Sequence, residues 1–343
     1  MTFPRFHQFF MKSFMSEIKK TNYGVYSALI DQYLEYKRSL GFKMGKNCEC
    51  YLRLFDRFTI DRGEERVGIS KELMDEWSKF RPNESEMTRY ARLSAIKAFS
   101  VYLVILGYEA YIPKLPKFKY TFTPHIYTQS ELSAIFRECD KLMPRQNRMG
   151  CPIHIMPTLI RMLYGTGIRI SEALSLTHGD VNVETGILWL RNCKNGRERI
   201  VPMSTTLTEV CKDYIAYKER LGLNVEPQKK FFVSRKGEIQ EDLVREYFKT
   251  VLYKAGISQN CRLHDLRHTA ASNALIKMSS SGMDLYSSLP ILMTYLGHQS
   301  LRATSQYLHI TYELYPQLLK KVNEIGKYVF PEICYEIENE EEL

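Results

Sequence analysis

The stretch RLHDLRHTAAS, residues 262–272, holds the most informative cluster of side chains in this sequence. His264, Arg267 and His268 lie within little more than one turn of a predicted helix, and the first two are spaced to share one helix face. The apolar residues recur at helical spacing and predict a face that packs on a core: Leu263, Leu266, Ala270 and Ala274. A guanidinium that stays charged therefore lies beside two imidazoles on a helix held by the core.

The composition predicts a globular chain of about two domains with a basic body. Its 343 residues are 44% hydrophobic and 25% charged, and a domain commonly takes about 100–200 residues. The formal net charge is +9, although residues 331–343 contain six acids and no Lys or Arg. A basic body with an acidic tail indicates a polyanion such as nucleic acid as the partner. The alternative at this point is a basic protein whose lysines serve only solubility.

The eight cysteines are scattered and predict neither a disulfide framework nor a metal site. No CxxC pair is matched by a second pair or by two histidines at zinc spacing, so we expect reduced thiols, no metal and no cofactor. Residues 1–22 lack the apolar stretch and the cleavage site of a secretory signal. The longest mostly apolar run, residues 98–106, is about half a membrane span. We therefore expect a cytoplasmic protein that does not enter a membrane.

Residues 23–112 carry a helical pattern throughout and predict a compact helical domain. Apolar residues recur at helical spacing in three stretches, residues 26–40, 48–58 and 84–108. Gly41 and Gly107 stand where the first and the last of these helices would end. Packing of the apolar faces predicts a bundle of about four helices.

Residues 1–22 form an extension in front of this domain. Four phenylalanines are spaced for one face of an additional amphipathic helix: Phe3, Phe6, Phe10 and Phe14. Such a helix either packs on the protein's own core or contacts another subunit, and the pattern leaves both open.

Residues 113–126 predict an extended basic linker. Three prolines block a helix, and no acidic residue lies between Glu109 and Glu131. The linker's lysines are Lys114, Lys117 and Lys119. The segment is either a simple surface connection or a strand of chain that lies along DNA phosphates.

Residues 127–330 mix helical patterns with a small sheet. Thr128 followed three residues later by Glu131 predicts a capped helix start. The run 165–167, Gly-Thr-Gly, breaks one helical pattern, and a new helix begins behind it. From residue 242 to residue 323 the pattern is again helical.

A β-hairpin is predicted within residues 186–203. Ile187, Trp189 and Arg191 alternate before Asn195-Gly196, which is a strong hairpin turn signal. The fold class predicted for the chain is therefore mainly α with a small antiparallel β-sheet, an α+β protein of two domains.

Six side chains in the second half are candidates for phosphate chemistry, although each alone is more commonly a surface or core residue. They are Arg169, Lys194, His264, Arg267, His298 and Tyr307. The first stands in GTGIRISEAL, the second beside the hairpin turn, and the next two in HDLRHT. The last two are the histidine of LGH and the tyrosine nine residues after it. In this order and these contexts the chain resembles the tyrosine recombinase (phage integrase) family.

The resemblance extends from about residue 127 to about residue 319. Residues 23–112 are more loosely similar to the helical core-binding domain of the family, which precedes a catalytic domain over residues 127–330 and the acidic tail. The segment between Arg267 and His298 is longer than the commonest form and resembles transposon-borne members.

The resemblance implies a site-specific DNA recombinase that works through a 3′-phosphotyrosine intermediate. Tyr307 would attack the scissile phosphate, and Lys194 would protonate the leaving 5′-oxygen. Arg169 and Arg267 would bind the non-bridging oxygens, because a guanidinium fork matches phosphate. The activity would serve integration, excision or transposition of a mobile element and would need no cofactor.

The same resemblance implies roles for the remaining polar residues. His264 would offer a hydrogen bond and transfer protons near neutral pH, and His298 would donate to the phosphate. His268 would support the catalytic groups, and Glu172 would orient a neighbour. The residues expected to contact DNA outside the site are Lys114, Lys117, Lys119, Arg191 and Arg197.

Double-stranded DNA is the implied partner, bound by four protomers on two sites. Residues 313–343 are candidates for docking on a neighbouring subunit. Two alternatives stay open. A type IB topoisomerase attacks DNA in the same way but relaxes it, and a DNA-binding regulator would keep the fold without the catalysis.

Overall fold

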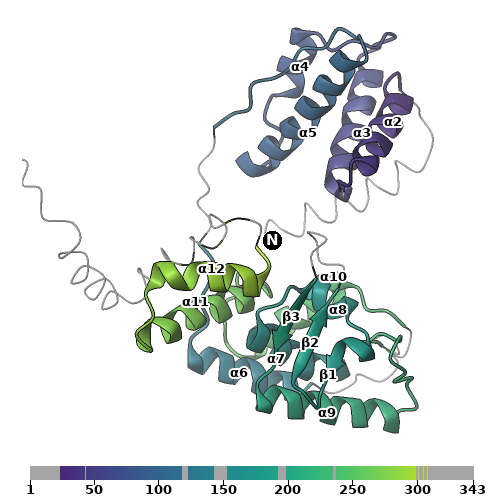
Figure 1. Cartoon of the computed structure of the whole chain (residues 1–343). Helices are drawn as coiled ribbons and strands as arrows, with labels where there is room; N and C mark the ends of the chain where they lie inside the picture. The colour runs from purple at the N-terminus through teal and green to yellow at the C-terminus, as the bar shows by residue number, and fades with distance from the viewer. Residues whose placement is uncertain are drawn as a thin grey trace, which may run out of the picture. The chain divides into compact units, whose positions relative to one another are not determined.

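The computed structural model describes residues 24–42, 44–117, 123–142, 153–191, 198–234, 237–298, 300, 304 and 307. The chain divides into two compact units, residues 1–122 and residues 123–343, and Figure 1 follows both from purple to yellow along the chain. Within the described residues, no helix combines the length and the apolar character needed to cross a membrane.

The described part of the first unit is a bundle of four α-helices around an aromatic core. The helices are α2 (Ser27–Ser39), α3 (Lys46–Asp61), α4 (Lys71–Trp77) and α5 (Glu86–Ile105). Tyr26, Tyr33, Phe55 and Phe99 are buried, and the ring centroids of three neighbouring pairs among them lie 5.5–6.1 Å apart. The helices predicted over residues 26–40, 48–58 and 84–108 are confirmed.

A buried ion pair ties α5 to the end of α4. Arg92 of α5 is 1% exposed, and its guanidinium donates twice to the Glu84 carboxylate, at 2.8 Å from both Nε and Nη2. It also donates to the backbone oxygens of Trp77 and Lys79, where α4 ends. These contacts use most of the guanidinium donors inside the unit, so the pair stabilises the bundle.

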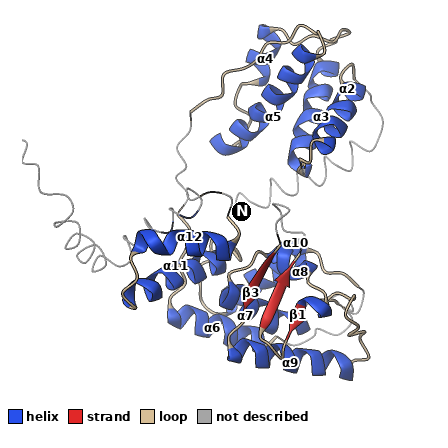
Figure 2. Cartoon of the chain, viewed as in Figure 1, coloured by secondary structure: helices blue, strands red, loops and turns tan. Residues whose placement is uncertain are grey.

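The second unit is mainly helical with a small antiparallel sheet, which confirms the predicted fold class (Figure 2). Its helices are α6 (Gln129–Asp140), α7 (Met156–Thr166), α8 (Ile170–Ser175), α9 (Thr205–Arg220), α10 (Glu241–Lys254), α11 (Asp265–Ser280) and α12 (Leu285–Leu296). Short 3₁₀ turns lie at Ile153–Ile155 and His178–Asp180. The predicted cap opens α6, because Thr128 Oγ1 accepts from the Glu131 N–H and the Glu131 carboxylate accepts from the Thr128 N–H.

The sheet runs in the order β1 (Val181–Asn182), β2 (Ile187–Leu190) and β3 (Arg199–Pro202), all antiparallel. The predicted hairpin is β2 and β3, with Leu190 opposite Arg199. The buried face consists of Leu188, Leu190 and Val201. Trp189 is exposed. The alternating residues that indicated the strand, Ile187, Trp189 and Arg191, therefore lie on the outer face of the sheet. Residues 192–197, at the hairpin tip, lie outside the described residues.

A glycine separates α7 from α8. Gly167 ends α7 with φ of 62°, in the left-handed region. A Cβ at this position would lie 3.2 Å from Leu296 Cδ2 and 3.6 Å from Ala270 Cβ, so glycine also permits the close approach of α11 and α12. The break is narrower than predicted, since residues 165 and 166 still belong to α7. It leaves Arg169 as the last residue before α8.

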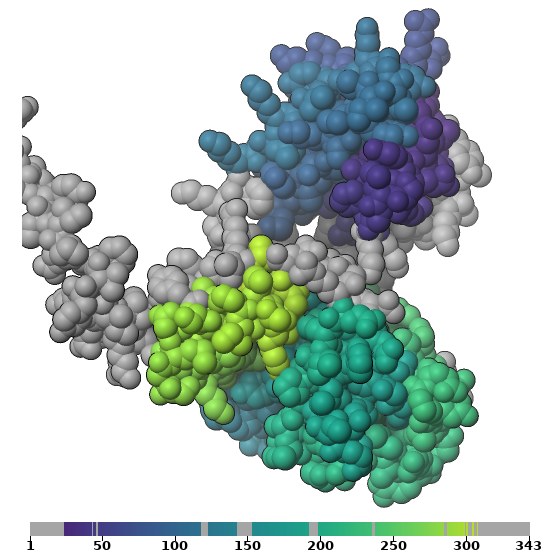
Figure 3. All heavy atoms as spheres, in the orientation of Figure 1, coloured from purple at the N-terminus to yellow at the C-terminus, as the bar shows by residue number. Residues whose placement is uncertain are grey.

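The helix that carries the opening motif, α11, packs against α7 and α12. Figures 1 and 3 draw the α11–α12 pair as the yellow-green part of the second unit. Its core side chains are Leu266, Ala271 and Leu275, all buried, whereas Ala270 and Ala274 are half-buried. Tyr307 belongs to one apolar cluster with Ala271 and Leu275 of α11 and with Leu292 and Leu296 of α12. The core face of α11 therefore holds the helix and the tyrosine in one packed group.

Candidate active site

Arg267 joins three helices at one point. Its side chain is 2% exposed. Nη1 donates to the Gly167 carbonyl oxygen at 2.7 Å, and Nη2 donates to the Leu296 carbonyl oxygen at 2.8 Å and to His298 Nε2 at 3.0 Å. Burial and the nearby charge of Arg169 lower the pKa of Arg267 to about 10, so the guanidinium stays charged at neutral pH. The ends of α7 and α12 are thereby fixed around one buried cation.

Glu172 lies between two arginines. Its carboxylate accepts from the backbone N–H and from Nη1 of Arg169, both at 2.9 Å. It also accepts from Nη1 and Nη2 of Arg199, at 3.0 and 2.8 Å. Burial alone would raise the pKa of Glu172, but the hydrogen bonds and charges of Arg199 and Arg169 lower it to about 2. The carboxylate is ionised at neutral pH and orients Arg169 at the start of α8.

His298 follows α12 and is neutral at neutral pH. Burial and the charges of Arg267 and Arg169 lower its pKa to about 4. Because Nε2 accepts from Arg267, Nδ1 carries the proton and donates to Thr304 Oγ1 at 2.9 Å. The tautomer of His298 follows from these two partners.

Tyr307 is packed directly onto this group. The residue is 1% exposed, and its ring is parallel to that of His298, with centroids 6.1 Å apart and planes at 8°. Its ring also lies 5.5 Å from that of His268. The negative charge of an ionised Tyr307 would raise the pKa of Arg267 against the effect of burial. The tyrosine from the end of the motif series thus reaches the buried cation of α11.

The two histidines of the opening stretch contact each other. Their rings lie 4.9 Å apart at 89°, with His264 exposed immediately before α11 and His268 buried in its first turn. Although part of the His264 side chain is exposed, shielding of its ring from water and the nearby arginines lower its pKa to about 4. Desolvation and His264 lower the pKa of His268 to about 3. Within the described part of the chain, His268 Nδ1 is buried without a hydrogen-bond partner. Both imidazoles are neutral at neutral pH.

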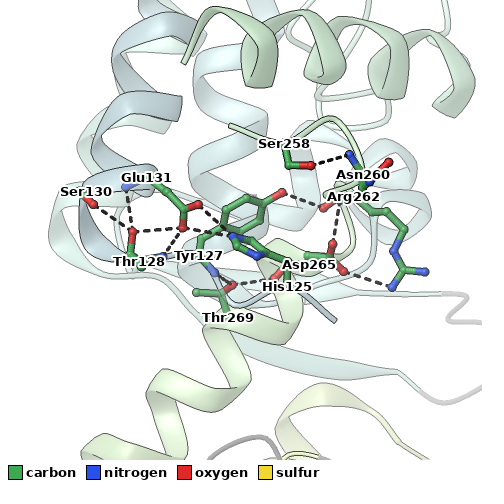
Figure 4. Close-up of polar contacts among 10 residues, drawn as sticks. All are labelled: His125, Tyr127, Thr128, Ser130, Glu131, Ser258, Asn260, Arg262, Asp265 and Thr269. Atoms are coloured by element: carbon green, nitrogen blue, oxygen red, sulfur yellow. Dashed lines mark hydrogen bonds and ion pairs between the residues drawn. The ribbon is translucent and has the colours of Figure 1, made fainter. Parts of the chain in front are cut away.

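A polar network holds the start of α11 in place (Figure 4). The Tyr127 N–H donates to Thr269 Oγ1 at 3.0 Å, and its hydroxyl donates to the Arg262 carbonyl oxygen at 3.2 Å. The Arg262 N–H donates to Asp265 Oδ2 at 2.7 Å. His264 lies between Arg262 and Asp265 in the chain, so the hydrogen bond between these two residues restrains its backbone.

Among the described groups of this site, positive charges outnumber negative charges. Three guanidinium groups, those of Arg169, Arg199 and Arg267, interact with the carboxylate of Glu172 and with one another. The neighbouring imidazoles are neutral, so positive charge remains uncompensated and favours a bound anion such as phosphate. No group of His, Cys, Asp or Glu among the described residues is arranged to hold a metal ion.

Some candidates lie apart from this group or outside the described residues. Lys194, Arg197 and Lys119 belong to the undescribed residues. Lys114 and Lys117 are exposed in the first unit. Arg191 is exposed beside the hairpin, where its Nε donates to Asp180 Oδ1 at 2.8 Å and its guanidinium lies 5.2 Å from the centre of the Trp189 ring.

Two residues of this group were missed by sequence reasoning. Thr304 receives the His298 hydrogen bond, and nothing in its local sequence marks it. Arg199 did leave a signal, because strand alternation puts it on the same face as the buried Val201. A charged residue on the buried face of a strand indicates a buried ion pair.

Comparison with known proteins identifies the family. The model of the phage integrase family matches residues 126–313, more than half of the chain. The integrase/recombinase y4rB of Sinorhizobium fredii is 27% identical over an alignment of 303 residues, and the match covers 85% of this chain and 95% of that protein. Tyrosine recombinase XerC of Chlamydia caviae is 30% identical over an alignment of 243 residues, and the match covers 68% of this chain and 71% of that protein.

Solved structures share the fold at lower identity. The Tn1549 transposon integrase in complex with transposon right-end DNA matches with a TM-score of 0.56 at 18% identity, over 81% of this chain and 93% of that chain. XerH bound to a palindromic difH substrate matches with a TM-score of 0.58 at 18% identity, over 82% and 78%. The resemblance found in the motifs is confirmed, and the chain belongs to the phage integrase family as a tyrosine site-specific recombinase.

Proposed function

We propose that this recombinase cleaves and rejoins DNA through a 3′-phosphotyrosine at Tyr307, in the service of a mobile element. The observation that best supports this is the stack of Tyr307 on His298, whose Nε2 accepts a hydrogen bond from Arg267. The phenol is thereby held beside a buried cation of the kind that binds phosphate.

The reaction moves one phosphoester bond. The Tyr307 oxygen attacks the scissile phosphorus, its proton passes to a base, and the bond from phosphorus to the 5′-oxygen breaks. Lys194 gives a proton to the leaving 5′-oxygen. The 5′-hydroxyl of a different strand then reverses these steps, so the energy of the phosphodiester is kept and no cofactor is consumed.

Arg169 and Arg267 act on the charge of the transition state. Their guanidinium forks bind the non-bridging oxygens, and removal of one such donor typically costs about 10²–10³-fold in rate. A tyrosine hydroxyl ordinarily ionises at about pH 10. Because nearby positive charge favours the anion, the same cations also help the phenolate of Tyr307 to form.

The histidines supply hydrogen bonds and proton transfer. His264, exposed at the start of α11, receives the Tyr307 proton or donates to the phosphate. His298 Nε2 is an acceptor in the DNA-free chain. A bound phosphate would raise the pKa of His298 and turn Nε2 into a donor. His268 supports His264 through their ring contact, and Glu172 orients Arg169.

DNA binding and assembly complete the proposal. Residues 23–112 would form the core-binding domain and residues 127–330 the catalytic domain, with phosphate contacts from the exposed Lys114, Lys117 and Arg191 and from Lys119 and Arg197. Four protomers would join two sites, with residues 313–343 docking on a neighbour, in the cytoplasm. A relative named as an integrase/recombinase and a structural neighbour that is a transposon integrase support the mobile-element role.

The test begins with the unknown target sequence. A pool of duplexes with a randomised core and a nick in one strand is incubated with the protein, and strands that become covalently linked are sequenced. The nick lets a short product diffuse away and traps the adduct. Wild type is expected to enrich a recurring sequence and to leave a free 5′-hydroxyl, whereas Tyr307→Phe forms no adduct. Tyr295→Phe, which alters a neighbouring phenol, is the matched control and keeps the adduct.

Other outcomes favour the alternatives. Sequence-specific binding without any adduct supports a regulator that lacks catalysis. An adduct that relaxes supercoiled plasmids but never exchanges strands between two enriched sites supports a topoisomerase. An adduct that persists in Tyr307→Phe overturns the assignment of the nucleophile.

A further inference from the structure

We infer that Arg199 is a positioning residue for the reaction, which acts through Glu172 to keep Arg169 free for the phosphate. This inference rests on the proposed function, since it concerns the same phosphoryl transfer. Arg199 begins β3, the second strand of the hairpin.

The side chain of Arg199 is fixed on two sides. It is 11% exposed, and two of its nitrogens bind the two oxygens of Glu172 at 3.0 and 2.8 Å. Nε donates to the Tyr295 carbonyl oxygen in α12 at 3.0 Å. A bidentate pair of this kind sets the plane of both groups. One side chain thus connects the hairpin, the start of α8 and the end of α12.

The turn before His298 is built around this guanidinium. Gly297 ends α12 with φ of 66°, and a Cβ there would lie 2.8 Å from Arg199 Nη1 and 3.0 Å from its Cζ. Only a residue without a side chain leaves room for Arg199 at this turn. The position of Arg199 is therefore coupled to the start of the segment that leads to His298 and Tyr307.

The charges explain what Arg199 contributes. Glu172 is buried and ionised, and a buried carboxylate needs compensation. Without Arg199, Arg169 alone would have to compensate the charge of the Glu172 carboxylate. The Arg169 side chain is 22% exposed and is the group proposed to bind the DNA phosphate. With Arg199 present, the carboxylate is compensated from the buried side. The positive charge and the hydrogen-bond donors of Arg169 then remain available to a phosphate. Arg199 also adds positive potential at His298 and Arg267.

A double-mutant cycle tests this coupling. The rate of adduct formation is measured at saturating protein on the enriched nicked duplex for Arg199→Ala, Glu172→Gln and the double variant. Arg199→Ala is expected to slow cleavage by about 100-fold, because a small displacement of Arg169 has an effect of that size. The rate of adduct formation in the double variant should fall by less than the product of the two single-variant factors, because Glu172→Gln removes the negative charge that needs a counter-cation. DNA affinity should stay close to that of wild type.

Two controls separate positioning from general stability. Arg161→Ala removes another bidentate arginine pair of the same unit, that of Arg161 Nη1 and Nη2 with Asp140 at 2.8 and 2.7 Å, and should leave the rate unchanged. A methylphosphonate at the scissile position removes one negative oxygen. On that substrate the Arg199→Ala defect should shrink, since less charge then has to be met by Arg169.

The outcomes are distinguishable. A wild-type rate in Arg199→Ala, or losses that simply multiply in the double variant, overturns the role of Arg199. So does an undiminished defect on the methylphosphonate. If Arg199→Ala does not fold, Arg199→Lys decides, because it keeps the charge without the fork and should be about tenfold slower; a wild-type rate there also overturns the inference. Absence of any adduct from wild type overturns the proposed function instead.

Discussion

Both units of this protein bury an arginine–glutamate ion pair, and the two pairs differ in how completely their charges cancel. In the first unit, Arg92 and Glu84 face each other through two hydrogen bonds of 2.8 Å. In the second unit, Glu172 is shared between Arg169 and Arg199. The first group, which Arg81 also neighbours, sets two guanidinium groups against one carboxylate, whereas the second sets three, those of Arg169, Arg199 and Arg267, against one.

The larger excess of positive charge is what distinguishes a site from a structural link. A second buried cation, Arg267, lies near the Glu172 group and is held by two backbone carbonyls and His298. Burying a cation in this way costs free energy, which the packing of α7, α11 and α12 must offset. A fold that only needed stability would gain nothing from this surplus, so the contrast with Arg92 indicates that the second group is built for an anion.

The largest effect is expected where the surplus charge is removed. Arg267→Ala should lower the rate of Tyr307 adduct formation at saturating protein by about 10³-fold, because a phosphate donor and the anchor of His298 are both lost. DNA affinity should change little, since many other phosphate contacts remain. Single-turnover cleavage and gel-shift titration measure the two quantities. Weaker binding with a wild-type rate at saturation would contradict the role given to Arg267.

Removal of the Arg92–Glu84 pair should act on stability instead. Arg92→Ala leaves the buried Glu84 without the guanidinium that binds it directly and should lower the free energy of unfolding by about 3–5 kcal/mol. Urea unfolding measures this loss, and the cleavage rate of the folded, DNA-bound protein should be unchanged. Arg62→Ala is the control, because its ion pair with the exposed Glu76 should contribute at most about 1 kcal/mol. A slow but stable Arg92→Ala protein would remove the distinction between the two pairs.

The smallest effect concerns the neutral imidazoles of the site. Burial lowers the pKa of His268 to about 3 from its usual 6.5. The unfolded chain therefore binds more protons below pH 6.5, and stability falls as the pH drops from there toward 3. Between about pH 7 and about pH 5, the free energy of unfolding should fall by about 1–2 kcal/mol less in His268→Gln than in wild type. Urea unfolding at both pH values measures this difference. Equal losses in the two proteins would show that His268 is not desolvated.

Local patterns along the chain predicted much of the fold. The helices α2, α3 and α5, the cap of α6 at Thr128 and the β2–β3 hairpin all follow from residues a few positions apart. Such signals survive without tertiary structure, because apolar spacing and capping bonds act over one or two turns. The outer face of β2 was harder to assign, since Trp189 and Leu190 are both apolar and only packing decides which is buried.

The candidate site was predicted in part. Arg169, His264, Arg267, His298 and Tyr307 were named from their contexts, and apart from the exposed His264 they meet around one buried cation. Arg199 was not named, because its partners are 27 residues away at Glu172 and 96 residues away at Tyr295. Periodicity carries no information about pairs at such separations.

The sequence by itself determined the helices α2, α3 and α5, the β2–β3 hairpin, the family and most of the chemical types at the site. The tertiary structure alone decided which cation meets which carboxylate, which imidazole is neutral, and that the phenol of Tyr307 stacks on His298. The physical reason is range. Helix and turn preferences depend on neighbours along the chain, whereas ion pairing and desolvation depend on distances through space that exist only after the chain has packed.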